Sequence, residues 1–233
     1  MQYCPDLDKY LKQLVVNGAT KFPSVSSASW RMSTYKDCLK EIGDKSYGEN
    51  LPANLAFLDL TNITNHLLPA LVSLAKKEFK YTVNSEDIYN VCRLVRPGDV
   101  SEGYRGHFDS HLFTLVTPIN IPNSKNIKDM GQLHYFPRTR AQPSNEIVNI
   151  SGKIFFKKYN SENGFFKLSQ KVERIIDSFQ DYKPLLFVGN TTFHGNSPVD
   201  TLLLQNRMTI LTHFFDISPR YGVGKIMRSL RSR

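Results

Sequence analysis

Cysteine is scarce in this sequence, and its placement excludes two common ways of stabilising a small domain. The 233 residues include three cysteines, Cys4, Cys38 and Cys92. Because their number is odd and they lie far apart, they predict reduced thiols in a cytoplasmic protein, not a disulfide framework or a zinc ribbon. A chain of this length can bury enough surface to fold as one large domain without such links.

Long hydrophobic runs are also missing. No apolar run approaches the roughly 20 residues that span a bilayer, and residues 1–6 lack the basic region and apolar core of a secretory signal. Hydrophobic residues make up 40% of the chain, a share that is typical of globular proteins. We therefore expect a cytoplasmic globular protein that has no membrane partner.

Acidic residues are absent from residues 217–233, which supply five of the nine net positive charges. A basic tail can bind nucleic acid or an anionic surface. This one has a single aromatic residue, Tyr221, and the chain has no glycine-rich phosphate loop. We therefore predict a solvated tail and expect no nucleic-acid partner. Its basic residues are Arg220, Lys225, Arg228, Arg231 and Arg233.

The N-terminal part of the sequence has the apolar spacing of amphipathic helices. Apolar residues recur at intervals of three and four over residues 7–15, 35–42 and 67–79. Gly18 and Gly43 stand where the first two helices would end. We interpret all three segments as helices that pack on the rest of the protein.

Beyond about residue 86 the pattern changes to short strands separated by turns. The strongest strand candidates are rich in β-branched and aromatic residues. They cover residues 88–95, 113–121, 184–188 and 208–215. Weaker strands are predicted at 131–136, 147–150 and 153–159, and a helix at 168–179 interrupts them.

Many short strands with turns between them indicate a sandwich or a jelly roll. The sequence has no internal repeat and no visible domain boundary. The predicted fold class is therefore mainly β with an α-helical N-terminal layer, in a single domain over residues 1–233. Its parts would be the helical layer at 1–85, a jelly-roll core at 86–216 and the basic tail at 217–233.

A histidine and an aspartate are spaced as two metal ligands on one strand would be. His107 and Asp109 are two residues apart, and such residues point to the same face of a strand. Two histidines and one carboxylate on one side of a metal define the mononuclear iron site that keeps open positions. The best third ligand is His194, which follows a predicted strand and precedes a turn. We predict that these three residues bind one metal ion.

An arginine and a threonine at the start of the last predicted strand suit a carboxylate ligand. Arg207 lies 13 residues after His194, and Thr209 shares its face of the strand. A guanidinium makes two parallel hydrogen bonds to a carboxylate, and the hydroxyl can add a third. We predict that this pair anchors a dicarboxylate.

Together these features resemble the Fe(II)- and 2-oxoglutarate-dependent dioxygenases, in particular the prolyl-hydroxylase-like and phytanoyl-CoA-hydroxylase-like branches. The resemblance covers about residues 88–216 and is carried by four stretches. They are Tyr104-Arg105-Gly106-His107-Phe108-Asp109, Phe113-Thr114-Leu115-Val116-Thr117-Pro118-Ile119-Asn120, Phe187-Val188-Gly189-Asn190-Thr191-Thr192-Phe193-His194-Gly195-Asn196-Ser197-Pro198-Val199 and Arg207-Met208-Thr209.

The resemblance implies a double-stranded β-helix, a form of jelly roll, with Fe(II) held by His107, Asp109 and His194. The halogenating relatives lack a carboxylate at the position of Asp109, so its presence here argues against a halogenating activity. The implied reaction uses dioxygen to hydroxylate an unactivated C–H bond of a small-molecule or peptide substrate, and it releases succinate and CO2.

The resemblance also implies that 2-oxoglutarate is the cosubstrate. Arg207 and Thr209 would bind its far carboxylate, and Tyr104 would add a hydrogen bond. The long stretch between the metal ligands and the helix at 168–179 depart from the compact prolyl-hydroxylase pattern, so the substrate is not assigned. Gln132 is a weaker candidate for a cosubstrate contact.

Other functions are compatible with the residues. A redox-silent, cupin-like jelly roll would bind zinc or manganese through His107, His111 and His194, and it would need no dicarboxylate anchor. A nucleic-acid-binding module would use the basic tail. In the oxygenase, His111 would contact the substrate or support a ligand, His213 would support the core or the site, and His134 would line the pocket.

Overall fold

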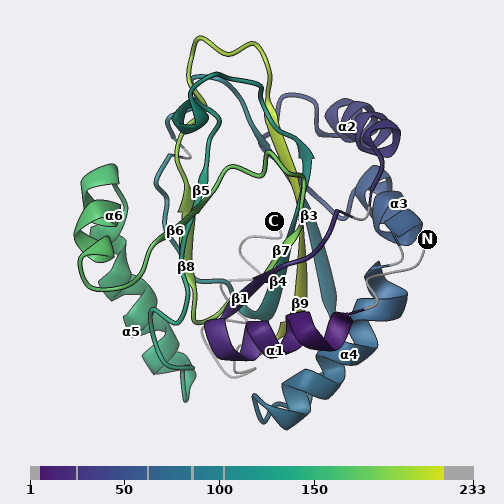
Figure 1. Ribbon diagram of the computed structural model, residues 1–233. Helices are drawn as coiled ribbons and strands as arrows, with labels where there is room; N and C mark the ends of the chain where they lie inside the picture. Colours follow the sequence, from purple (N-terminus) through teal and green to yellow (C-terminus); the bar gives the residue numbers. More distant parts are fainter. Residues whose placement is uncertain (1–5, 25, 62, 85–86, 102, 218–233) are drawn as a thin grey trace.

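Two antiparallel β-sheets form the centre of the molecule, with helices on their outer sides (Figure 1). The structure is a computed structural model, and it describes residues 6–217 apart from residues 25, 62, 85–86 and 102. The antiparallel β core and the helical N-terminal layer that the sequence predicts are both present. The basic tail lies outside the described residues, so its solvation stays a prediction.

The larger sheet has six strands, and each neighbouring pair in it is antiparallel. Its longest strands lie side by side because the chain's longest β-branched and aromatic runs pair there. In spatial order the strands are β1 (Ala19–Lys21), β7 (Leu185–Val188), β4 (His111–Asn120), β9 (Arg207–Asp216), β3 (Ile88–Val95) and β2 (Tyr47–Glu49).

Alternation along the strands gives this sheet two different faces. On β4, Phe113 and Leu115 belong to the hydrophobic cluster under the N-terminal helices. Val116 belongs to a second cluster that includes Leu133 and Tyr135 of the smaller sheet. Successive side chains of a strand point to opposite faces, so the six-stranded sheet has an outer face against helices and an inner face toward the smaller sheet.

The N-terminal helices cover the outer face of the six-stranded sheet (Figure 1). Leu14, Cys38 and Leu71, from three different helices, are fully buried in the shared cluster. Gly18 ends the first helix in the left-handed conformation, with φ 77°. The helices are α1 (Leu7–Asn17), α2 (Ala28–Ile42), α3 (Pro52–Thr61) and α4 (Ile63–Lys77).

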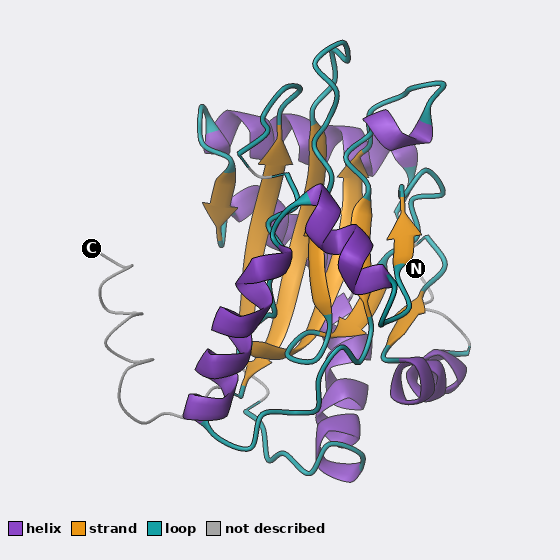
Figure 2. Ribbon diagram, turned by 90° about the vertical axis from the view of Figure 1, so that its left-hand side faces the viewer, coloured by secondary structure: helices purple, strands orange, loops and turns teal. Residues whose placement is uncertain are grey.

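The smaller sheet has three strands, and two helices lie on its outer side, in front of the strands in Figure 2. Its order is β6 (Ile175–Asp177), β5 (Leu133–Phe136) and β8 (Phe193–Asn196). The two helices are α5 (Glu146–Phe156) and α6 (Glu162–Ser169), joined by the short 3-10 helix η2 (Lys157–Tyr159). A second 3-10 helix, η1 (Ile127–Asp129), precedes β5.

Some of the weaker sequence predictions are wrong. Residues 147–150 and 153–159 were expected as strands, but α5 and η2 occupy them. The side chain of Asn145 accepts a hydrogen bond from the Val148 amide and so starts the helix. The predicted helix at 168–179 is also wrong, because α6 ends at Ser169 and β6 pairs with β5. Short apolar windows do not distinguish helix from strand when tertiary pairing decides.

No helix among the described residues is long and apolar enough to cross a membrane.

The shared cluster predicts that the helical layer and the sheets unfold as one unit. Leu71→Ala, in α4, should cost about 2–5 kcal/mol because it opens a cavity at a fully buried position. Urea unfolding should give one transition that coincides by circular dichroism and by fluorescence. The exposed Val16→Ala should change stability by less than about 0.5 kcal/mol. Two separate transitions would contradict a single domain.

Candidate metal centre

His107 and His194 are held side by side by their own main chains. The His107 amide donates to the His194 carbonyl at 2.9 Å, and the His194 amide donates back to the His107 carbonyl at 3.0 Å. Such a pair puts both side chains on one face, and the ring centroids are 4.4 Å apart. His194 lies on β8, whereas His107 forms an isolated bridge and not a full strand.

Asp109 enters the site from the segment that leads into β4. Its amide donates to the Gly189 carbonyl at 3.1 Å. A Cβ atom at Gly189 would lie 2.8 Å from the Thr114 hydroxyl and 3.0 Å from the Asp109 Cβ, so the close approach requires glycine. The Thr114 hydroxyl donates to Asp109 Oδ2 at 2.5 Å. The carboxylate is therefore fixed by a strand and a turn together.

The three predicted ligands form one compact donor set. One donor atom each from His107, Asp109 and His194 lies within 4.8 Å of the other two. The Nε2 atoms of the histidines are 3.5 Å and 3.7 Å from the Asp109 oxygens. The Nδ1 atoms lie 3.1 Å from the carbonyls of Arg105 and Thr192. A carbonyl can only accept, so Nδ1 carries the proton and Nε2 keeps its lone pair for a metal.

The charges of the site suit metal binding. Burial would raise the pKa of Asp109, but the neighbouring imidazoles of His194 and His213 outweigh burial and hold it well below the usual range. Burial lowers the pKa of His194 to about 4 and that of His213 to about 4. At neutral pH the site therefore offers the carboxylate of Asp109 and the neutral imidazole of His194, the forms in which these groups bind a metal.

His213 and His111 lie beside the donor set without belonging to it. His213 Nδ1 is 3.8 Å from Asp109 Oδ2 and 3.0 Å from the Thr114 hydroxyl. The rings of His111 and His213 stack at 5.0 Å, and Tyr89 stacks with both. His213 thus supports the site, one of its two predicted roles. A contact between His111 and a substrate or ligand stays a prediction.

A small cavity opens beside Asp109 and is partly lined by residues that the sequence analysis did not assign. Its volume is about 20 Å³, enough for about one water molecule. Asn190 lines the cavity and is buried. Neither the oxygen nor the nitrogen of its side-chain amide makes a hydrogen bond within the protein. Asn149 of α5 lines the same cavity. Only their position after folding identifies these residues, because the sequence pattern contains no signal for them.

Arg207 is buried on the inner face of β9, with 2% of its surface exposed. Its Nε has no hydrogen-bond partner. Burial lowers its pKa to about 9, with a further contribution from the like charge of Arg93, so the side chain stays charged at neutral pH. Gly131 leaves room for its stem, because a Cβ there would lie 3.2 Å from the Arg207 Cδ. A buried cation of this kind is costly unless an anion pairs with it.

The other predicted contacts fall in different places. Thr209 is buried two residues from Arg207 on the same strand face. Tyr104 packs its ring on His134 and Phe165. His134 is paired with Gly195, next to His194, so it points to the opposite face of the small sheet. Tyr104 and His134 therefore lie under α6 and away from the donor set.

Gln132 contributes a main-chain hydrogen bond: its carbonyl accepts from the Ser197 amide at 2.9 Å.

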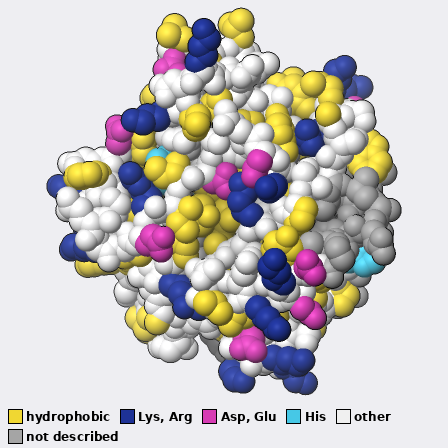
Figure 3. Space-filling view, in the orientation of Figure 1, with side chains coloured by type: hydrophobic (Ala, Val, Ile, Leu, Met, Phe, Trp, Pro, Cys, Tyr) yellow, Lys and Arg dark blue, Asp and Glu magenta, His cyan; other side chains and the backbone are white. Residues whose placement is uncertain are grey.

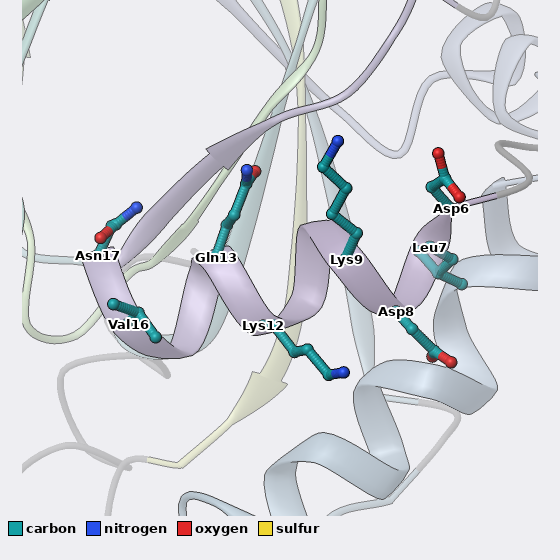
Figure 4. Close-up of a pocket in the computed structure, with 8 residues that line it drawn as sticks. All are labelled: Asp6, Leu7, Asp8, Lys9, Lys12, Gln13, Val16 and Asn17. Atoms are coloured by element: carbon teal, nitrogen blue, oxygen red, sulfur yellow. The ribbon is translucent and has the colours of Figure 1, made fainter.

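A larger hollow of about 770 Å³ lies along α1 and not at the donor set. Its lining side chains diverge from both sides of the helix and do not converge on one point (Figure 4). It includes no histidine or cysteine. We assign the site to the donor set, where buried charges converge.

Loss of the Asp109 carboxylate should remove the metal. Loss of a residue that only hydrogen-bonds to a metal ligand lowers metal affinity by about 10- to 100-fold. Asp109→Ala removes one of the three ligands themselves, so the Fe(II) affinity should fall by more than that. Anaerobic equilibrium dialysis measures this, with circular dichroism to verify the fold. His111→Ala is the matched control and should keep the metal. Metal loss in the His111 variant, with retention in the Asp109 variant, would favour the cupin-like ligand set.

The Thr114 hydroxyl should tune the same affinity. Thr114→Val keeps the shape of the side chain but removes the donor to Asp109, so Fe(II) affinity should fall by about 10- to 100-fold. Thr114→Ser should restore most of it. Equal affinities in the valine variant and the unchanged protein, measured by the same dialysis, would mean that the hydroxyl does not orient the carboxylate.

Neither a family model nor a curated protein matches this sequence, but solved structures match its fold. A prolyl-4-hydroxylase of Pseudomonas putida is 13% identical and aligns over 93% of this chain and 100% of its own, with a TM-score of 0.55. The non-haem, α-ketoglutarate-dependent epimerase SnoN, in complex with Fe3+, α-ketoglutarate and nogalamycin RO, is 11% identical over 94% and 88%, with a TM-score of 0.56.

A third similar structure is EvdO2 of Micromonospora carbonacea var. aurantiaca, complexed with 2-oxoglutarate. It is 13% identical over 95% of this chain and 96% of its own, with a TM-score of 0.53. At the level of the fold, the resemblance that the sequence predicts is confirmed: the chain has the fold of the iron- and 2-oxoglutarate-dependent oxygenases.

Proposed function

We propose that the protein is an Fe(II)- and 2-oxoglutarate-dependent oxygenase that hydroxylates an unactivated C–H bond. The observation that carries the proposal is the presence of two features on the inner side of the sheets. One is the compact donor set of His107, Asp109 and His194. The other is the buried guanidinium of Arg207. The first suits an iron ion with open positions, and the second suits a carboxylate.

We propose a double-stranded β-helix for the core at residues 86–216, within one domain over residues 1–233. The strand order supports this form of jelly roll. Along the chain the core alternates between the sheets, from β4 to β5 and β6, then to β7, β8 and β9. The His107–His194 bridge adds a short pairing at the edge of the smaller sheet. The donor set would then lie between the two sheets.

The chain's own residues would prepare the metal for this chemistry. His107, Asp109 and His194 would hold the iron, and the carbonyls of Arg105 and Thr192 would keep both imidazoles oriented. When bound, the iron and 2-oxoglutarate would activate dioxygen and supply the oxidant for the C–H bond, with release of succinate and CO2. His194 is neutral and Asp109 is charged at neutral pH, so neither of these two ligands has to lose a proton before the metal binds.

Arg207 would hold the far carboxylate of 2-oxoglutarate. The carboxylate of Asp177 offsets the burial of this guanidinium only in part, since its pKa is still lowered, and a carboxylate ligand would complete the pairing. Thr209 stands on the same strand face and would add a neutral hydrogen bond. Asn190 would orient a ligand or a water in the small cavity, since its buried amide has no partner in the protein. Tyr104 is left out of this role because it packs under α6.

The redox-silent, cupin-like alternative is not favoured. The donor set contains Asp109 and not His111, and a cupin-like site has no use for a buried arginine that suits a dicarboxylate. The substrate is a small molecule or a peptide in this proposal. Similar structures include a prolyl-4-hydroxylase and an epimerase bound to nogalamycin RO.

Removing the guanidinium should weaken cosubstrate binding and leave the metal in place. Arg207→Met keeps the bulk of the stem but leaves the far carboxylate unpaired. Breaking a buried charged pair costs about 3–5 kcal/mol, so the affinity for 2-oxoglutarate should fall by about two to three orders of magnitude. Anaerobic titration of 2-oxoglutarate into the Fe(II)-loaded protein measures this change.

The matched control for that titration is Arg96→Met. The Arg96 guanidinium binds the carbonyls of Gly43 and Lys45, so its loss should leave 2-oxoglutarate affinity unchanged. Equal affinities in the Arg207 variant and the unchanged protein would mean that Arg207 is not the anchor. Loss of Fe(II) in the Arg207 variant would point to damage of the whole site.

A further inference from the structure

The helix α5 presents its apolar side chains to solvent and its polar side chains to the protein. Its outward face, opposite Asn149 and Lys153, is made of large hydrophobic residues that a globular helix normally buries. Their exposed fractions are 78% for Ile147, 47% for Val148, 36% for Ile150, 61% for Ile154 and 57% for Phe155. Such a contiguous apolar face on a surface helix marks an interaction site.

Polar contacts and one aromatic contact hold the inward face of α5 in place. The Asn149 side chain accepts a hydrogen bond from Arg140 at 2.8 Å. Lys153 Nζ donates to the Ser110 hydroxyl at 3.2 Å. Phe156 packs edge-to-face on Phe108. The helix is therefore seated firmly with its apolar side outward. Asn149 and Ser110 also line the cavity beside Asp109, so the same helix borders the candidate metal centre.

The segment that carries this apolar face is rich in lysine. Residues 146–171, from the start of α5 through α6, contain five lysines and two acidic residues, Glu146 and Glu162. Lys158 Nζ lies 3.4 Å from the centroid of the Phe155 ring, so a cation stands directly beside the apolar surface. Figure 3 shows basic and hydrophobic side chains, with some acidic ones among them, on the side that α5 and α6 occupy in Figure 1. The lysines are Lys153, Lys157, Lys158, Lys167 and Lys171.

The charge decides between possible occupants. In a two-fold dimer of this chain, the same patch would meet itself, and the lysine-rich rims would repel each other. An anionic lipid surface is complementary to both parts of the patch. Apolar side chains of a helix can insert at the level of the headgroups, while lysines extend to the phosphates. A helix that lies on a membrane needs no spanning segment, so the lack of apolar runs does not exclude this contact.

We propose that the exposed face of α5 docks on an anionic lipid surface. Ile147, Ile154 and Phe155 enter the headgroup region, and Lys157 and Lys158 contact lipid phosphates. The proposal replaces our expectation of no membrane partner, and it does not depend on the oxygenase assignment. Because α5 borders the cavity beside Asp109, docking would place that cavity close to the lipid surface.

Vesicle sedimentation with the full-length protein tests the proposal. Vesicles of phosphatidylcholine containing phosphatidylserine should bind the protein, and pure phosphatidylcholine should bind it more weakly. The double variant Ile154→Ser with Phe155→Ser should reduce binding to the anionic vesicles by about tenfold or more, because two inserting side chains are lost. Lys157→Gln with Lys158→Gln should weaken binding and reduce its sensitivity to salt.

A matched control uses exposed apolar residues elsewhere. Leu202 and Leu204 are 86% and 99% exposed in the loop before β9, and changing both to serine should leave vesicle binding unchanged. The proposal is overturned if the anionic vesicles do not bind the protein, or if the α5 variant binds them as well as the unchanged protein does. It is also overturned if analytical ultracentrifugation shows a dimer that the α5 variant abolishes, because the occupant is then a second copy.

Discussion

The two reciprocal main-chain hydrogen bonds between His107 and His194 bring together residues that are 87 positions apart in the chain. They fix the imidazoles on one face, and the segment after His107 then places Asp109 3.5 Å and 3.7 Å from the two Nε2 atoms. The donor set is therefore a product of backbone pairing and depends little on side-chain packing. Any change that separates these two segments would dismantle the site even if all three ligands remained.

Two buried charges of opposite sign lie in this interior. Asp109 is a carboxylate at 8% exposure, and Arg207 is a guanidinium at 2% exposure. The imidazoles of His194 and His213 and the Thr114 hydroxyl stabilise the charged form of Asp109. Burial and the like charge of Arg93 disfavour the charged form of Arg207, and the carboxylate of Asp177 offsets this in part. A cation beside Asp109 and a carboxylate beside Arg207 would satisfy both.

Short-range patterns predicted the parts of this structure that local spacing determines. The long strands β3 and β9 and the helix stop at Gly18 follow from period, composition and capping. The sequence did not predict that Thr114 and Asn190 belong to the site, because only the tertiary structure brings them beside Asp109. The segment of α5 was misassigned because sequence patterns presume that apolar residues are buried, and here they face solvent.

The central claim is that one metal and 2-oxoglutarate bind together between the sheets. Anaerobic addition of Fe(II) and 2-oxoglutarate, followed by visible absorption, tests it most directly, because a keto acid bound to Fe(II) gives a charge-transfer band. We expect a band that appears only when Fe(II) and 2-oxoglutarate are both added and that saturates at one equivalent of iron. The absence of a band, with iron bound but 2-oxoglutarate left free in solution, would contradict it.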